Sequence, residues 1–592
     1  MSVKLNRLFE ETVEFDIQSL TYFSTRPEDI EAWRLALRDF ELGEAAKQVF
    51  ISLLELRHID WSEQTRFDVV QTIEPVITHL FASLEQHYLD HALIDAKRDQ
   101  QISDLVLEIK THLALLYKEI FERTHEQIQT TKFSLFNFNG KKRLIQLRNN
   151  AAINALEHFN NLLYSLQLIY VDPPRLFWAT CYSIYQTAFK DDFEQEQVER
   201  KSNQHQTIYS VERAFINLVV FSILNGNKLR QTEVKELKRL IPDWTPYVKL
   251  HTKPTPDTNY AILYESKIAP RVYIADEYRN EPASFIDFQD LIAYIEKNVR
   301  LSEQSNLGDS KSLSSVLRHH VITTLQLKLT RIQPRLNDEG FVQVALGIHP
   351  AHFFISGAKE FKESLKLDIG FGLQSISQEY KSTAAAESSL EYAQQQKVKS
   401  LQRLEEQQLS NEIFRIRTAS IINRSEKGYG LRWQAEAVKN LRTGDFILIK
   451  ENQKNHWNGG LIRWLKNAPD RSVELGIEVL SHKICAVAVY IPKVNVSQPV
   501  YHPALIYRPI ESPNDYAIIL PSAQLFHENQ NLSLRFDTIE TKIFLQKSTN
   551  LTQSCASFNF GLLEQSRKAE LDEFFTQQII SATTQDLWES LK

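Results

Sequence analysis

The apolar residues in the first half of the chain recur with the spacing of an α-helix, and this periodicity limits the fold more than any other feature. Between residues 102 and 120 they are three or four positions apart, at Ile102, Leu105, Val106, Ile109, Leu113, Leu116, Tyr117 and Ile120. Such spacing gives a helix one apolar face, which must be buried against other helices. The same period runs from about residue 26 to residue 250. The sequence therefore predicts an all-α array or bundle over residues 1–250, with roughly eight helices.

Histidines in this half offer no metal site. His87 and His91 are four residues apart and share one helix face, but no third ligand stands at a metal-binding spacing. We interpret them as helix-surface histidines. The helical half is expected to be a scaffold with an interaction surface, and we predict no metal ligands in the chain.

Residues 251–328 have a mixed character. Prolines at 254, 256 and 270 indicate a linker, or an extended crossing into a second region, over 251–270, and the pattern predicts a helix from Phe285 to Asn298. A loop rich in Ser, Gly, Asn and Asp follows, and a further helix is expected from Val316 to Lys328.

Short β-type runs dominate after residue 329. They are Phe341 to Gly347, Phe414 to Ile422, Asp445 to Ile449, Gly460 to Trp464, Val473 to Val479 and Ile484 to Ile491. Several short strands at this spacing predict a small antiparallel barrel over residues 329–495. Residues 358–412, rich in Lys, Glu, Gln, Ser and Ala, are predicted to be an insertion. Four more strands and a helix near 564–580 predict a second small β domain over 496–592.

Two polar elements within the barrel region are candidates for a ligand site. The run Asn423 to Gly428 follows an apparent strand that ends at Ile422, and we interpret it as a glycine-set corner that presents Asn423 and Ser425. The other element is Arg331 and Arg335, which flank Pro334 at the entry into the barrel.

Length, charge and cysteine content limit the class of protein. A chain of 592 residues predicts roughly three or four domains. The net charge of -6 argues against DNA or RNA binding, and the basic-aromatic stripe of an RNA-binding barrel is missing. No secretion signal and no apolar run of membrane-spanning length is found. Three widely spaced cysteines fit a reducing compartment, so a cytoplasmic location is expected.

The barrel region resembles a PilZ domain, the bacterial receptor module for the second messenger cyclic di-GMP. Arg331 and Arg335 match the family's RxxxR element, and Asn423, Ser425 and Gly428 match its D/N-x-S-x-x-G element. The whole chain is similar to long proteobacterial proteins with helices before a PilZ-like barrel. The resemblance implies that these five residues bind cyclic di-GMP. It completes the expected fold class: a multidomain α+β protein with a helical array, a PilZ-like antiparallel β-barrel and a second small β domain.

The spacing of the two elements departs from the compact family pattern. Arg335 and Asn423 are 423 − 335 = 88 positions apart. The elements meet only if residues 358–412 loop out, which costs little because closure entropy grows slowly with loop length.

No enzymatic motif accompanies these elements. The chain contains no GxxxxGK[ST], HExxH, GxSxG or CxxC pattern and no recognisable cyclase or phosphodiesterase signature, so no catalytic residue and no cofactor is expected. The prediction is a cytoplasmic cyclic di-GMP receptor that couples ligand binding to a protein partner of the helical half, in motility, pilus or surface control. The alternative is a degenerate PilZ-like adaptor that binds no nucleotide.

Overall fold

The computed structural model describes residues 2–89, 97–131, 138–201, 206–224, 226–275, 282–305, 313–327, 336–337, 340–359, 361–364, 415–434, 441–451, 456–468, 472–492, 499–521 and 525–577. The chain forms two compact units. Unit 1 consists of residues 1–332 with 436–440 and 466–471, and unit 2 consists of the remaining residues from 333 to 592.

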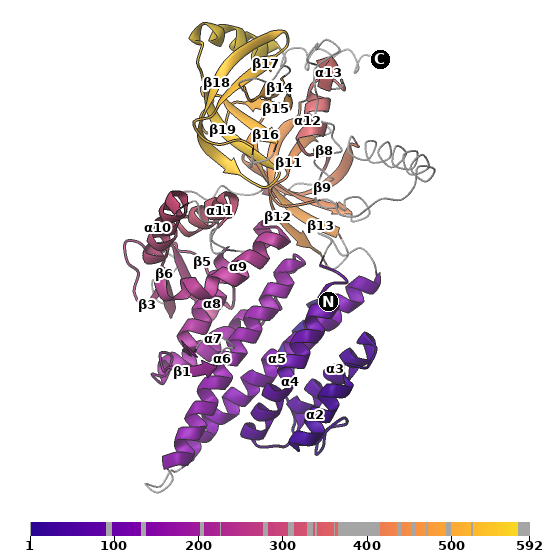
Figure 1. Ribbon diagram of the computed structural model, residues 1–592, viewed down its shortest axis with the longest axis vertical. Helices are drawn as coiled ribbons and strands as arrows, with labels where there is room; N and C mark the ends of the chain where they lie inside the picture. Colours follow the sequence, from indigo (N-terminus) through magenta and orange to yellow (C-terminus); the bar gives the residue numbers. More distant parts are fainter. Residues whose placement is uncertain are drawn as a thin grey trace. The chain divides into compact units, whose positions relative to one another are not determined.

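Unit 1 is mainly helical, as its apolar period predicts (Figure 1). Its N-terminal helices are α1 (Ser2–Glu10), α2 (Pro27–Ala36), α3 (Leu42–His58), α4 (Glu63–Glu85), α5 (Lys97–Thr130), α6 (Phe138–Leu168), α7 (Phe177–Lys190), α8 (Val211–Leu224) and α9 (Gln231–Trp244). α2 begins at a proline, and the Ser62 side chain accepts a hydrogen bond from Thr65 N at the start of α4. A hairpin of β1 (Val198–Lys201) and β2 (Gln206–Tyr209) interrupts the helices.

A four-stranded antiparallel sheet follows the helices where the sequence suggested a linker. Its order is β3-β6-β4-β5, with β3 (Lys249–His251), β4 (Tyr260–Leu263), β5 (Arg271–Val272) and β6 (Ala283–Asp287). The linker interpretation of 251–270 was wrong, because all four residues of β4 are buried. The predicted helix at Phe285 also began too early: β6 occupies that position, and α10 spans Gln289–Ser305. α11 (Ser315–Leu325) confirms the second helix.

The first half of unit 2 is a closed antiparallel barrel, which confirms the predicted barrel. The strands pair in the order β8-β9-β10-β13-β12-β11, and β11 closes the barrel onto β8. Their bounds are β8 (Phe341–Leu346), β9 (Arg417–Ser425), β10 (Gly428–Gln434), β11 (Phe446–Glu451), β12 (Asn458–Asn467) and β13 (Ser472–Ser481). A short strand, β7 (Leu336–Asn337), extends the sheet beside β9.

Strands β8 and β9 are neighbours although a long segment separates them in the sequence. Phe341 is paired with Ser420 and Val344 with Arg417. Of the intervening residues, α12 (Ile348–Ile355) and α13 (Phe361–Ser364) are described. Most of the predicted insertion 358–412 lies outside the described residues. The pairing shows that the chain returns to the same sheet after this segment.

The second half of unit 2 is another closed six-stranded antiparallel barrel. Its order is β14-β15-β16-β19-β18-β17, with β14 (Ile484–Tyr490), β15 (His502–Tyr507), β16 (Ala517–Pro521), β17 (Asn531–Phe536), β18 (Ile539–Leu551) and β19 (Cys555–Leu562). A helix over 568–577 follows. The sequence grouped β14 with the first barrel, but β14 is paired with β15 and β17. It also missed β19.

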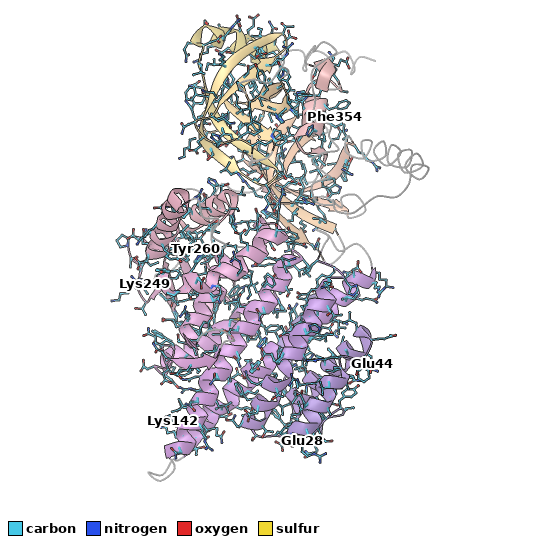
Figure 2. The ribbon with its side chains drawn as sticks, viewed as in Figure 1. Glu28, Glu44, Lys142, Lys249, Tyr260 and Phe354 are labelled. Atoms are coloured by element: carbon cyan, nitrogen blue, oxygen red, sulfur yellow. The ribbon has the colours of Figure 1, made fainter. Side chains whose placement is uncertain are left out.

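An apolar core joins the two barrels and α12 within unit 2. It contains Leu448, Leu461, Leu505, Ile519 and Ala351. Phe354 of α12, labelled in Figure 2, stacks on Trp457 with ring centroids 6.0 Å apart. The two barrels therefore share buried contacts and are not independent modules on a string.

Candidate ligand-binding site

The β9–β10 hairpin carries the Asn423 to Gly428 motif. β9 continues through Asn423 to Ser425, and only Glu426 and Lys427 form the turn. The predicted corner was therefore placed too early: Asn423 and Ser425 lie in a strand, not in the turn. Ser425 is paired with Gly428 and Asn423 with Gly430.

The hairpin places alternate side chains on opposite faces. Residues directly opposite each other in an antiparallel pair project to the same face. Arg424 is opposite Tyr429, which is buried, so these two side chains are on the inner face of the barrel. Asn423 and Ser425, opposite Gly430 and Gly428, are on the outer face. Both remain partly exposed.

The side chains of Asn423 and Ser425 are not used in hydrogen bonds within the described part of the chain. Asn423 and Ser425 form no side-chain hydrogen bond with another described residue. Two donor-acceptor groups close to the main chain are thus available on a rigid strand.

The two glycines of the hairpin let other atoms come close to the main chain, and neither is needed to reach a positive φ. Neither Gly428 nor Gly430 has a positive φ. A Cβ on Gly428 would lie 2.5 Å from the Ile477 carbonyl oxygen, and a Cβ on Gly430 would lie 2.8 Å from Asn423 Oδ1. The space beside Gly428 is therefore occupied by β13, whereas Gly430 gives room to the Asn423 amide.

The segment that follows Arg335 is a neighbour of the same hairpin. In the β7–β9 pairing, Leu336 is opposite Arg424 and Asn337 is opposite Asn423. Arg331 and Arg335 themselves lie outside the described residues. Across 88 positions of sequence, the structure nevertheless brings the residue bonded to Arg335 beside the Asn423 motif.

A polar network lies behind the motif, inside the barrel. Tyr429 Oη donates to Glu451 Oε1 at 2.6 Å, and Arg424 Nη1 donates to Glu451 Oε2 at 3.3 Å. Asn458 Nδ2 lies 3.4 Å from Tyr429 Oη, and Asn458 Oδ1 lies 2.9 Å from His482 Nδ1. Burial, together with the bond to Glu451, raises the pKa of Tyr429, so it remains a hydrogen-bond donor.

Sequence reasoning did not select these inner residues. The alternation of a strand was available as a signal, since Arg424 lies between Asn423 and Ser425 and must face the other way. The partners Glu451 and Asn458 come from other strands and carry no motif. Their proximity follows only from the pairing of β11 and β12 with the rest of the barrel.

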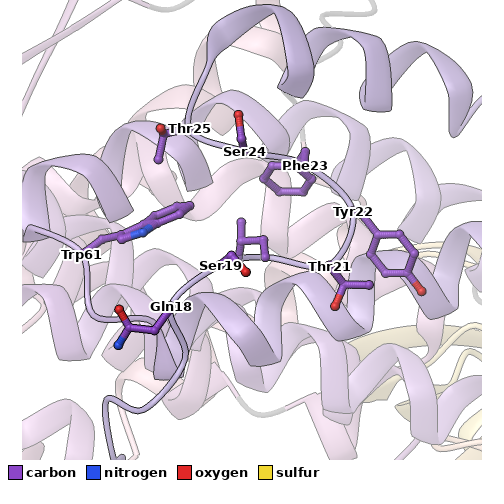
Figure 3. A pocket seen from close by; sticks show the side chains of 9 residues that line it. Gln18, Ser19, Thr21, Tyr22, Phe23, Ser24, Thr25 and Trp61 are labelled. Carbon is purple, nitrogen blue, oxygen red and sulfur yellow. The ribbon is translucent and has the colours of Figure 1, made fainter.

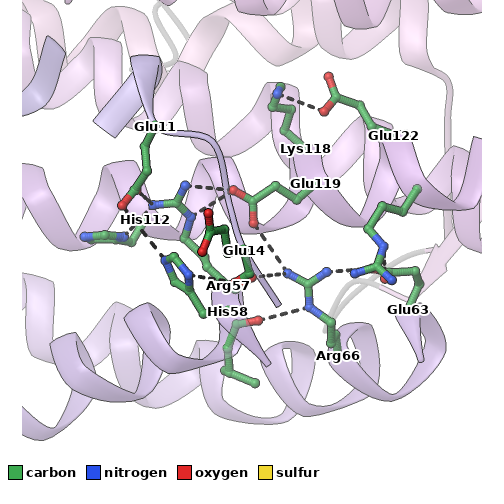
Figure 4. A network of polar contacts seen from close by, with 12 residues as sticks. Glu11, Glu14, Arg57, His58, Glu63, Arg66, His112, Lys118, Glu119 and Glu122 are labelled. Atoms are coloured by element: carbon green, nitrogen blue, oxygen red, sulfur yellow. Dashed lines mark hydrogen bonds and ion pairs between the residues drawn. The ribbon is translucent and has the colours of Figure 1, made fainter. Parts of the chain in front are cut away.

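Other polar and hollow features of the described chain do not involve the motif. A cavity of about 420 Å³ in unit 1 is lined by the loop 18–25 and Trp61 (Figure 3). A buried charge network, also in unit 1, links Arg57 and Arg66 to Glu119, with Glu119 Oε1 2.8 Å from Arg57 Nη2 (Figure 4). Both belong to the helical scaffold.

Comparisons with known proteins agree with this architecture. The family model described as "Cyclic-di-GMP receptor FimW, N-terminal domain" matches residues 28–256, and "Cyclic-di-GMP receptor FimW, middle PilZ domain" matches residues 264–484. The chain belongs to the FimW family. The middle-domain match covers every strand of the first barrel and confirms the PilZ resemblance.

The FimW relationship extends over nearly the whole chain. The cyclic-di-GMP receptor FimW of Pseudomonas aeruginosa (strain PAO1) is 21% identical over 573 residues, covering 92% of this chain and 92% of that protein. No solved structure matches the chain. The family is named for a receptor, in agreement with the prediction of a sensor that is not an enzyme.

Among the described helices, none is both long enough and apolar enough to cross a membrane. The three cysteines, Cys181, Cys485 and Cys555, are buried, and none of them forms a disulfide bond.

Proposed function

We propose that the chain is a cyclic di-GMP receptor whose ligand binds on the outer face of the first barrel, between the Arg331–Arg335 segment and the β9–β10 hairpin. The observation that carries this proposal is the β7–β9 pairing, in which Leu336 is opposite Arg424. Consecutive Cα atoms are about 3.8 Å apart, so Arg335 is covalently held close to the strand that carries Asn423 and Ser425. The FimW family match supports the identity of the ligand.

The residue types fit the chemistry of this ligand. Cyclic di-GMP has two phosphates and two guanines. Guanidinium groups bond phosphate oxygens and the O6 and N7 acceptors of guanine in a planar fork that lysine cannot form. Asn423 offers an amide carbonyl that accepts from guanine N–H groups, and Ser425 offers a hydroxyl to a base edge or phosphate. The two elements supply complementary contacts.

The strand position of Asn423 and Ser425 favours binding energetically. Their side chains are not committed to other described residues and are held by the β-ladders on both sides, from β10 and β7. A preorganised pair loses little conformational freedom when the ligand binds. Several good base contacts of about 1–3 kcal/mol each are sufficient for micromolar affinity.

Ligand binding is proposed to act on the helical half through chain connectivity. The Arg331–Arg335 segment is the covalent connection between α11, which ends at Leu325, and β7, which begins at Leu336. A ligand that binds this segment shifts the equilibrium between the conformations of the connection. The size of the shift depends on how much more tightly the ligand binds one conformation than another. We propose that a protein partner of the helical half reads this change, and that the receptor acts in the cytoplasm, where cysteines remain as thiols.

Isothermal titration calorimetry of the full-length chain with cyclic di-GMP tests the proposal. We expect binding by the unmodified chain and a loss of at least about tenfold in affinity for each of Arg331→Ala, Arg335→Ala and Asn423→Ala. Arg239→Ala, an exposed arginine on α9, is the matched control and is expected to bind normally.

Two outcomes would defeat the receptor proposal. The first is an absence of binding heat at high micromolar concentrations of the unmodified chain. The second is unchanged affinity in both arginine variants at positions 331 and 335. Either result would favour the adaptor that binds no nucleotide.

A further inference from the structure

A short segment near the N-terminus crosses the helices of unit 1 without forming a helix of its own. Residues 11–17, here called the strap, follow α1 directly. At its end the strap is paired with the chain between α3 and α4: Ile17 N donates to His58 O at 3.2 Å, and Asp60 N donates to Ile17 O at 3.0 Å. Two backbone hydrogen bonds contribute little net stability in water. The side chains of the strap must therefore supply the remaining attraction.

The first of these side chains completes a buried ion-pair cluster. Arg57 Nη1 donates to Glu11 Oε2 at 3.0 Å, and the Arg57 side chain is only 1% exposed (Figure 4). Among the described residues, the cluster beneath the strap otherwise contains three arginines and two glutamates: Arg57, Arg66, Arg123, Glu63 and Glu119. Buried charges are costly unless they are paired. The cluster therefore takes its third carboxylate from the strap.

The second side chain is aromatic and lies against the same arginines. The Cζ atoms of Arg123 and Arg66 are 3.9 Å and 5.2 Å from the centroid of the Phe15 ring. The face of an aromatic ring attracts a cation through its quadrupole, and guanidinium groups form this contact most often. The surface of Arg57, Arg66 and Arg123, here called the arginine face, thus binds a carboxylate and a ring that are four residues apart in an extended chain.

The strap is weakly held compared with the chain on either side of it. None of its seven residues is buried, whereas Leu5 in α1 and Leu20 beyond the strap are 2% and 8% exposed. A segment with few buried contacts opens locally at low cost. The strap can therefore leave the arginine face while its flanks stay in place. A cavity of about 420 Å³ begins at Gln18, one residue beyond the strap, and offers space to a longer segment (Figure 3).

We propose that the arginine face is the docking site for the protein partner of the helical half, and that the strap occupies this site until the partner displaces it. The partner contributes an extended, acidic segment with an aromatic residue. Its carboxylate replaces that of Glu11 on Arg57, and its ring replaces that of Phe15 on Arg123. An acidic segment is required because the uncovered cluster has one arginine in excess. This inference rests on the part of the proposed function that gives the helical half a protein partner.

A synthetic peptide with the sequence of Glu11 to Gln18, Glu-Thr-Val-Glu-Phe-Asp-Ile-Gln, is the probe. It carries a fluorescent label, and its binding to the full-length chain is measured by fluorescence anisotropy. The double variant Glu11→Gln with Phe15→Ala weakens the hold of the strap on the arginine face. A tethered segment competes at an effective concentration in the millimolar range. The double variant is therefore expected to bind the peptide at least about tenfold more tightly than the unmodified chain.

Altered peptides and a further substitution test where and how the probe binds. Peptides that carry Glu11→Gln or Phe15→Ala should each bind the double variant more weakly than the original peptide. Arg123, with 37% of its side chain exposed, is the most accessible arginine of the face. Adding Arg123→Gln to the double variant should weaken peptide binding about threefold or more. Adding Arg239→Gln, at an exposed position on α9, is the matched control and should leave binding unchanged. Thermal unfolding is measured for every variant, so that a lost fold is recognised.

Three results would overturn the docking site. They are an absence of saturable binding to the folded double variant at high micromolar peptide, equal affinity of the unmodified chain and the double variant, and an affinity that folded Arg123→Gln does not change. The titration contains no cyclic di-GMP, so its failure leaves the receptor proposal standing. A chain that binds the peptide but not cyclic di-GMP would lose the receptor proposal and keep the docking site.

Discussion

Inside the first barrel, the hydroxyl of Tyr429 donates a 2.6 Å hydrogen bond to the carboxylate of Glu451. The same carboxylate accepts from Arg424, which lies between Asn423 and Ser425 in β9. The outer face that we assign to the ligand is thus supported from the inner face of the same strand. Residues that touch no ligand are expected to affect the site through this contact.

Tyr429→Phe should destabilise unit 2 by about 1–3 kcal/mol, because it removes the 2.6 Å hydrogen bond from Tyr429 to the buried Glu451 carboxylate. Urea unfolding of the full-length chain measures this loss. The matched control is Tyr490→Phe on the second barrel, where Tyr490 Oη also donates to a glutamate, Glu540, at 2.7 Å. Glu540 keeps bonds from Ser533 and Tyr501, so the control should lose less stability. Equal unfolding midpoints for the two variants would contradict the expectation.

The two hairpin glycines should respond differently to alanine. At Gly428 the obstacle is the Ile477 main-chain oxygen at 2.5 Å, which cannot move without distorting the β10–β13 ladder. At Gly430 the obstacle is the Asn423 amide at 2.8 Å, which rotates away. We expect Gly428→Ala to lower thermal stability, and Gly430→Ala mainly to weaken binding of cyclic di-GMP.

Gly43 in α3 is the control for these glycine substitutions. A Cβ there meets no atom within 4 Å, so Gly43→Ala should leave binding intact and keep or raise stability by about 0.5–1 kcal/mol. Normal ligand affinity in folded Gly430→Ala would mean that the orientation of Asn423 does not matter.

Much of this architecture follows from periodicity alone. The i, i+3, i+4 pattern of α5 predicts a helix because it repeats over many turns, and the alternating run of β13 predicts a strand. β4, in contrast, is four consecutive buried residues among prolines, and such a short apolar run has no period to detect. The assignment of β14 failed for another reason, since sequence does not reveal which strand closes a barrel.

In the candidate site, too, some residues could be predicted from the sequence and others could not. Motif spacing selected Asn423, Ser425 and Gly428 because each is a residue type that ligand chemistry requires. Glu451 was missed because its role depends on neighbours in other strands. Its proximity to the hairpin is a property of the pairing register, which is long-range information.

Stability of unit 1 should fall in mild acid because of His112. Its Nδ1 lies 3.1 Å from Arg57 Nη1, so the arginine donates and the ring is held neutral. Burial, and then the charges of Arg57 and His58, lowers the pKa of His112 to about 3. The unfolded chain binds this proton near pH 6.5, whereas the folded chain resists it. The contribution of His112 is therefore complete above pH 6.5 and declines as the pH falls toward 3.

Urea unfolding between pH 7 and pH 4 measures this decline, with a limiting slope of about 1.4 kcal/mol per pH unit for His112. His112→Gln keeps an acceptor for Arg57 and removes the titration, so its curve should be flatter. Parallel pH curves for the two proteins would show that other groups govern the acid sensitivity.

The buried Lys110 should be costly to remove on its own. Its Nζ lies 2.6 Å from Glu85 Oε1 and 2.6 Å from Ser165 Oγ, and it also lies over the Phe81 ring. Lys110→Met leaves a largely buried carboxylate unpaired, and we expect a loss of about 3–5 kcal/mol in the free energy of unfolding. The double variant Lys110→Met with Glu85→Gln removes the unpaired charge and should recover part of that loss.

The pair of Lys4 and Glu108, in which only the lysine is exposed, provides the comparison for Lys110. Lys4 keeps 71% of its side chain exposed, so Lys4→Met should change stability by only about 0–1 kcal/mol. If Lys110→Met were no more destabilising than Lys4→Met, the Glu85 carboxylate would have to be neutral or solvated in the folded chain. A double variant less stable than Lys110→Met alone would show that Glu85 has a second partner that outweighs its buried charge.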